Sequence, residues 1–177
     1  MHSNNNFHLI NDEVSQAEHY PVCYGQNDIQ CLLELAKVSH NKRHRFLLHP
    51  TKHDKFHEML ISIPGNSFDI PHMNIRSGKS FTALAGCFSV VIFDEDCNYF
   101  NHNILEANGN QFPSYLRLQE PVWHTIMPCD GQVVFKESIA GPFLGNIFSE
   151  QFTYPDSKDF KGRVLNIRKN LDNILNS

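Results

Sequence analysis

The sequence has few of the features that point to a membrane, to secretion or to a nucleic-acid partner. No apolar run approaches the roughly 20 residues that cross a bilayer, and residues 1–8 lack the cationic segment and apolar run of a signal peptide. Charged residues make up only 19% of the chain, and the formal net charge of −4 comes from interspersed signs, so no basic field favours nucleic acid or an anionic surface. We therefore expect a cytoplasmic protein that binds neither nucleic acid nor membrane.

The cysteines are too scattered to indicate a zinc site or a dithiol redox site. They are Cys23, Cys31, Cys87, Cys97 and Cys129, and no two of them form a C-x-x-C pair. An odd number of widely spaced cysteines is typical of free thiols in a reducing compartment. None has a His at a diagnostic spacing, so a Cys nucleophile is not indicated.

What the chain does contain suits one β-rich core. Hydrophobic residues make up 41% of its 177 residues, and Phe is abundant, with 14 copies against a single Trp. This length is usual for one domain, and no repeat or low-complexity linker divides the chain. We expect residues 1–26 to form an N-terminal tail, either mobile or as a strand over the barrel, and residues 27–177 to form a single domain.

Hydrophobic periodicity predicts two helices flanking a set of strands. Residues 28–40 carry apolar side chains at helical spacing, with Asn27 or Asp28 as the cap, and residues 163–175 repeat at three and four. Between them, short runs with the period of two that strands require are separated by Pro, Gly, Asn or Asp. These runs are 59–63, 81–84, 88–93, 99–105, 115–118, 123–127 and 132–136. The pattern indicates a mainly β fold, an antiparallel barrel or jelly roll.

Two short segments, around His72 and His124, carry the most chemical information. His72 and Asn74 stand two residues apart, so in a strand they share one face. Two histidines make half of a tight metal site, which usually has three or four protein ligands. The amide oxygen of Asn74 is a weak ligand for a transition metal, and the ammonium of Lys79 opposes a bound cation.

Further candidates for ligand binding have two interpretations each. Arg45 and His49 can bind an anion such as a sugar acid or a phosphate, or be a solvated loop charge and a surface His. Phe81 and Trp123 can form a stacking wall for a sugar ring, or pack in the core. Glu137 can face the cavity as an additional acid.

The spacing of these residues resembles the cupin pattern. In that pattern His-x-His is followed by three or four residues, Glu, six residues and Gly, and here His72, Asn74, Lys79 and Gly86 occupy the four positions. His124 stands where cupins carry their last His ligand.

Over residues 27–160 the chain also resembles the WbuC-type cupin fold metalloproteins, small proteins often associated with bacterial surface-polysaccharide (O-antigen) gene clusters. The segments that carry this resemblance are 45–50, 57–61, 67–72, 91–94, 122–125, 134–137, 141–143 and 148–155.

The resemblance implies a cupin barrel and a divalent metal, Zn, Fe, Mn or Ni, held by His-x-His, Glu and His. Only His72 and His124 match those ligands, whereas Asn74 and Lys79 replace a His and the Glu. We therefore expect a metal to be bound weakly or not at all. The family also implies a homodimer.

Three functions stay open. In the first, the protein works in surface-polysaccharide metabolism, binds a sugar or another small anionic ligand, and acts as an isomerase or epimerase with His72 or His124 as general acid/base. In the second, it is an Fe- or Zn-dependent oxygenase or hydrolase with the metal on these histidines and Asn74. In the third, it is a non-catalytic binding or regulatory protein. Lys79 counts against the second function and favours an anionic ligand.

Overall fold

The computed structural model describes residues 6–96, 98–148 and 158–176, the last segment with side chains from residue 161. Ten strands and two helices follow one another along these residues. They are β1 (Phe7–Asn11), β2 (Val14–Ala17), α1 (Gln26–Val38), β3 (His44–Leu47), β4 (Phe56–Ile63), β5 (His72–Asn74), β6 (Lys79–Phe93), β7 (Tyr99–Glu106), β8 (Tyr115–Leu118), β9 (Trp123–Ala140), β10 (Asn146–Phe148) and α2 (Lys158–Leu175). The mainly β fold with a helix near each end confirms the predicted fold class.

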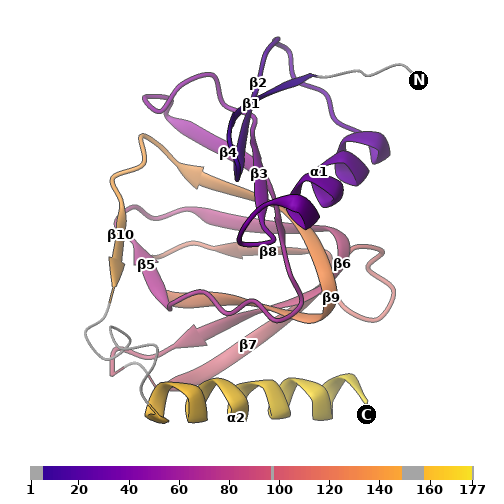
Figure 1. Ribbon diagram of the computed structural model, residues 1–177. Helices are drawn as coiled ribbons and strands as arrows, with labels where there is room; N and C mark the ends of the chain where they lie inside the picture. The colour runs from indigo at the N-terminus through magenta and orange to yellow at the C-terminus, as the bar shows by residue number, and fades with distance from the viewer. Residues whose placement is uncertain (1–5, 97, 149–157, 177) are drawn as a thin grey trace.

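The long strands β6 and β9 form the centre of the barrel. They pair antiparallel from Lys79 opposite Ile139 to Phe93 opposite Trp123. β4 pairs with the second half of β9 and β5 with its beginning, whereas β7 and β8 pair with the two halves of β6. Because both long strands bend, the strands that flank them enclose one interior, as Figure 1 shows.

Two glycines bend these strands where the sequence predicted that they would end. Gly86 in β6 and Gly131 in β9 have φ angles of 74° and 60°, in the region that L side chains rarely adopt. The register of the β6–β9 ladder shifts around Cys87, which is the signature of a bulge. A bulge admits an extra residue without breaking the ladder, so each pair of predicted strands is one bent strand.

Helix α1 begins two residues before its predicted start. Gly25 is the N-cap residue, and its backbone amide donates to Oδ2 of Asp28 at 2.8 Å, so Asp28 acts from inside the first turn. The helix buries Ile29, Leu32 and Ala36. The first two pack in a cluster with side chains of β3, β4 and β9.

Helix α2 lies on the opposite side of the barrel from α1 (Figure 1). It begins at Lys158, before the predicted residue 163. Its Ile167 and Leu171 are buried against side chains of β6, β7 and β9, including Val91 and Met127. Among the described residues, no helix combines the length and apolar character that crossing a bilayer would require.

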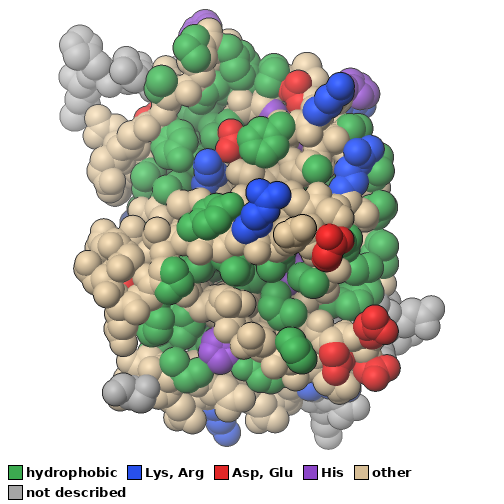
Figure 2. Space-filling model, turned by 180° about the vertical axis from the view of Figure 1, so that it is seen from behind, with side chains coloured by type: hydrophobic (Ala, Val, Ile, Leu, Met, Phe, Trp, Pro, Cys, Tyr) green, Lys and Arg blue, Asp and Glu red, His purple; other side chains and the backbone are tan. Residues whose placement is uncertain are grey.

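Residues 7–17 belong to the predicted N-terminal tail, either mobile or a strand over the barrel, and they form the hairpin β1–β2. β2 continues the sheet through a parallel pairing with β3, and Phe7 stacks on Phe46 with ring centroids 4.2 Å apart. On the face shown in Figure 2, apolar side chains are interspersed with charges of both signs, in keeping with the small net charge.

Candidate functional site

A cavity of about 340 Å³ lies inside the barrel, between β3, β4, β5, β6 and β9. Its wall is built by the alternation of strand side chains, which sends every second residue of each strand inward. Seven of the nine candidate residues line it. They are Arg45, His49, His72, Asn74, Lys79, His124 and Glu137.

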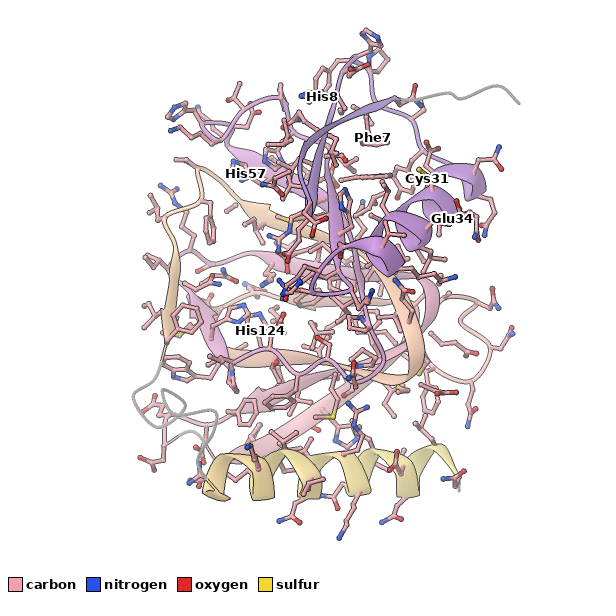
Figure 3. The ribbon with its side chains drawn as sticks, viewed as in Figure 1. Phe7, His8, Cys31, Glu34, His57 and His124 are labelled. Carbon is pink, nitrogen blue, oxygen red and sulfur yellow. The ribbon has the colours of Figure 1, made fainter. Side chains whose placement is uncertain are left out.

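His72 and His124 are direct neighbours across the β5–β9 pairing, and their ring centroids lie 4.7 Å apart. Nδ1 of each ring is held by a carbonyl two residues earlier, at 3.1 Å from Ile70 and 2.8 Å from Val122. A neutral ring that donates from Nδ1 presents Nε2 as an acceptor. The backbone thus orients both rings in one tautomer. Figure 3 shows His124 within the barrel.

The ammonium of Lys79 sits between a histidine and a carboxylate. Its Nζ lies 3.0 Å from Nε2 of His124 and 3.0 Å from Oε2 of Glu137. It also lies 5.1 Å above the ring of Phe81. Lys79 is only 6% exposed, so its charge is compensated inside the protein rather than by water.

The two histidines are uncharged near neutral pH. Burial, then the charge of Lys79 and the neighbouring His72, holds the pKa of His124 well below its usual value of 6.5. The pKa of His72 is also lowered, mainly by burial and next by Lys79. The site therefore combines two neutral imidazoles with one ammonium–carboxylate pair.

These residues do not fit a bound divalent metal. Nε2 of His124, which a metal would require, accepts from Lys79 instead, and Glu137 pairs with the same ammonium. Asn74 donates from Nδ2 to Oδ1 of Asn146 at 2.8 Å. Within the described ranges, no group of three or more His, Cys, Asp or Glu is arranged to hold a metal ion. A cation at the centre of the donor set opposes a second cation there.

The cavity has an excess of positive charge. Arg43 forms two hydrogen bonds with Asp69, both 3.1 Å long, and the ion pair of Lys79 is also neutral overall. Arg45 and Lys52 line the cavity as well, and in the part of the chain that the structure describes neither side chain has an ion-pair partner. With His72 and His124 neutral, Arg45 and Lys52 therefore contribute two positive charges to the lining that its carboxylates do not balance.

Of the two interpretations for Phe81 and Trp123, the structure has the packed one, and neither side chain lines the cavity as a stacking wall would. Phe81 is fully buried below Lys79 and packs edge-on against His124, with ring centroids 5.9 Å apart. Trp123 packs in the cluster beneath α2. It precedes His124 directly in the strand, so its side chain points to the opposite face.

Sequence reasoning missed His57, which is 3% exposed and lines the cavity beside His49. The two rings stack with centroids 4.0 Å apart, and burial followed by the charge of His49 lowers the pKa of His57. In Figure 3, His57 lies closer than His124 to the end of the barrel that carries β1 and β2. Its alternation with Met59 and Ile61 was the signal that could have placed it on the inner face. Arg43, Lys52, Asp69 and Asn146 were missed too.

Comparisons with known proteins support the fold. A family model described as a domain of unknown function (DUF6016) matches residues 24–105. A search of curated protein sequences finds no significant match. The family description makes no mention of WbuC, so that resemblance stays a prediction.

Among solved structures, the chain is similar to oxalate oxidase in complex with the substrate analogue glycolate, with a TM-score of 0.51 and 10% identity over 77% of this chain and 74% of that one. A cupin-2 domain containing protein from Shewanella frigidimarina (TM-score 0.41, 10% identity, 54% of this chain, 78% of that chain) also matches. Procruciferin, an 11S globulin from Brassica napus, matches with a TM-score of 0.43 and 10% identity over 53% of this chain and 22% of that chain. This chain therefore spans about a fifth of the length of procruciferin. Similarity at these identities concerns the fold alone, and that fold is a cupin-type antiparallel jelly roll.

Proposed function

We propose that this protein is a metal-independent cupin that binds a small anionic sugar derivative in the barrel cavity and acts on it as an isomerase or epimerase. The observation that carries the proposal is the position of Lys79. Its ammonium contacts both His124 and Glu137, so a fixed cation stands among the residues that the cupin pattern would assign to a metal. The resemblance to WbuC-type proteins supports surface-polysaccharide metabolism as the cellular context.

The charges of the cavity favour an anion. Arg45 and Lys52 have no ion-pair partner among the described residues, and a carboxylate or phosphate would supply the missing charge. A guanidinium binds such groups with two parallel hydrogen bonds. The volume of about 340 Å³ is near the lower end of small-molecule pockets, which start at roughly 300 Å³. One sugar ring suits this size, with any nucleotide part extending to the mouth.

A sugar hydroxyl also has a partner in the cavity. Oδ1 of Asn74 is buried and has no hydrogen-bond partner within the described ranges, although Nδ2 of the same amide is satisfied by Asn146. An unsatisfied buried acceptor costs roughly 1–3 kcal/mol, which a donating hydroxyl would recover. This feature supports a polyhydroxylated ligand over a simple anion.

The histidines support acid–base chemistry. Nε2 of His72 has no partner among the described residues, whereas that of His124 accepts from Lys79. His72 is therefore the group that we assign as the base that removes a proton from a substrate carbon. Lys79 would stabilise the negative charge that develops on the neighbouring substrate oxygen. Return of this proton from His72 to the adjacent carbon completes an isomerisation, whereas an epimerisation takes a new proton on the other face of the carbon from a second acid, such as a water molecule.

Binding is tested by calorimetry with a panel of sugar acids, sugar phosphates and nucleotide sugars. Arg45→Gln should weaken binding at least 10-fold, in keeping with the roughly 1.5–3 kcal/mol of a hydrogen bond to a charged group. Arg117→Gln is the matched control, because Arg117 is an exposed residue of β8 and does not line the cavity. Equal affinity in wild type and Arg45→Gln, or no binding across the panel, contradicts the proposal.

Catalysis is tested on any compound that binds. In D₂O, NMR should show deuterium entering the substrate at carbon, and His72→Gln should slow this exchange at least 100-fold, within the range expected of a general base. Affinity for the compound should change little. Tight binding without exchange in the wild type would instead support the non-catalytic binding or regulatory function.

A further inference from the structure

Cys87 and Cys129 meet in the folded protein although 42 residues separate them in the chain. Cys87 lies in β6 beside the bulge at Gly86, and Cys129 lies in β9 where that strand bends. Their Sγ atoms are 2.8 Å apart. This separation is less than 1 Å longer than the roughly 2.05 Å of an S–S bond, so only a small shift separates the two thiols from bonding distance.

The surroundings hold this pair in place and leave it accessible. Both cysteines are partly buried, and both pack against the cluster of Val91, Met127 and Leu171 beneath α2. A small solute can reach them, whereas the strand pairing prevents the sulfurs from drifting apart. Neither residue lines the barrel cavity.

We propose that Cys87 and Cys129 are a redox modification site, a dithiol that a peroxide or a small-molecule disulfide converts reversibly into a disulfide between β6 and β9. In a reducing compartment the pair rests as two thiols, and oxidation there is typically transient and sensory. The bond would cross-link the two long strands next to their bulge, at a place where the ladder itself is irregular.

With hydrogen peroxide, the thiolate of Cys87 attacks one oxygen atom and breaks the O–O bond, which yields Cys87 sulfenic acid and hydroxide. The Cys129 thiol then attacks the sulfenic sulfur, and the S–S bond forms as water leaves. In sum two thiols are oxidised and the peroxide is reduced to two water molecules. Two equivalents of a small thiol reverse the change through disulfide exchange, and they leave as the small-molecule disulfide.

The electrostatics assign the two roles. The Cys129 thiol stabilises the Cys87 thiolate by hydrogen bonding and lowers the pKa of Cys87, whereas the same contact and burial raise the pKa of Cys129. The lower pKa makes Cys87 the attacking group and Cys129 the resolving thiol.

The test uses the full chain, treated with one to a few equivalents of hydrogen peroxide. We expect the intact mass to fall by two hydrogen atoms, non-reducing peptide mapping to locate the link at Cys87–Cys129, and dithiothreitol to reverse it. The oxidised protein should unfold at a temperature on the order of 5 °C higher, because a cross-link restricts the unfolded chain.

Variants separate this pair from the other thiols. Cys129→Ser should block the cross-link and let a sulfenic acid accumulate on Cys87, trapped by dimedone, whereas the exposed control Cys23→Ser should cross-link at the wild-type rate. A disulfide that joins other cysteines in the wild-type protein overturns the proposal. So does the absence of any intramolecular link after Cys23 has been oxidised. Both outcomes are read on the wild type, so they do not depend on how the variants fold.

Discussion

The ammonium of Lys79 donates to Nε2 of His124 at 3.0 Å, across a separation of 45 residues in the chain. The lone pair that would bind a metal in a cupin of the usual pattern is therefore engaged by a side chain of the same protein. Glu137 completes the arrangement by balancing the ammonium at 3.0 Å. A lysine at this position thus changes both the charge and the hydrogen bonding of the cavity, and the first predictions concern its consequences.

Replacing the two departures from the cupin pattern together should create a metal site. In the double variant Asn74→His and Lys79→Glu, His72 and His124 would be joined by a third imidazole and a carboxylate. We expect zinc or nickel affinity to rise by at least about 100-fold over wild type, since mutations of ligand-supporting groups alone change affinity roughly 10- to 100-fold. Competition with a chromophoric chelator measures it.

The matched control for this experiment combines Asn74→His with Lys136→Glu. Lys136 belongs to the same strand as Glu137 but pairs with Glu58 and does not line the cavity. The control variant should therefore bind zinc or nickel as weakly as the wild type does. Wild-type protein that already retains stoichiometric metal against the chelator would contradict the expected effect of Lys79.

Removing one partner of the buried ion pair should destabilise the protein more than removing both. Lys79→Met leaves the Glu137 carboxylate, whose side chain is 15% exposed, without its counter-ion, and this should lower the free energy of unfolding by about 3 kcal/mol. Adding Glu137→Gln should recover part of the loss. Urea unfolding of both single variants and the double variant measures the coupling. Additive losses would show that the two charges do not interact.

The Lys136–Glu58 pair is the comparison for this double-mutant cycle of Lys79 and Glu137. Its side chains are 28% and 31% exposed, so water screens the pair. Lys136→Met should cost no more than about 1 kcal/mol.

Stability should fall as the pH decreases below about 6.5. In the unfolded chain a histidine gains its proton near this pH, whereas burial and Lys79 keep the pKa of His124 well below it in the folded protein. The unfolded state therefore binds more protons on the acid side, and the stabilising contribution, complete above pH 6.5, is lost as the pH drops toward the folded pKa. His72 adds to the effect in the same direction.

Urea unfolding at several pH values measures the slope of the free energy of unfolding against pH. His124→Gln should reduce it by up to about 1.4 kcal/mol per pH unit, the contribution of one proton. His19→Gln should leave it unchanged, because His19 is exposed in the folded chain. A pH dependence that is undiminished in His124→Gln would mean that other groups, such as His72, cause all of the acid sensitivity.

Two glycine substitutions should have opposite effects. At Gly65 an added Cβ would lie 2.6 Å from the carbonyl oxygen of Gly131, a backbone atom that cannot move aside. Gly65→Ala should therefore cost about 2 kcal/mol or more. Gly162 lies in α2 with nothing within 4 Å of the added carbon, so Gly162→Ala should stabilise the protein by roughly 0.5–1 kcal/mol. Thermal unfolding compares the two; equal effects would contradict the close contact at Gly65.

Most of the secondary structure could be predicted because it depends on local periodicity. The alternation of Met59, Ile61 and Ile63 indicated a strand with one buried face. Residues 56–63 do form strand β4, but Leu60 and Ser62 on its other face are buried as well, because α1 packs on that side. The strand ends were less predictable, because a glycine such as Gly86 both terminates strands and forms bulges. Only the neighbouring strand decides between these outcomes, through the ladder that continues past the bend.

The sequence alone determined which residue types stand at the positions of the cupin pattern. Spacing, alternation and charge can all be read along the chain without knowing which strands pair. Only the folded barrel determined which of these side chains are in contact. Register places Glu137 next to Lys79, turns Trp123 away from His124, and joins Cys87 to Cys129. Such pairings depend on which strands become neighbours and on where their bulges fall, and both are set by the packing of the whole barrel.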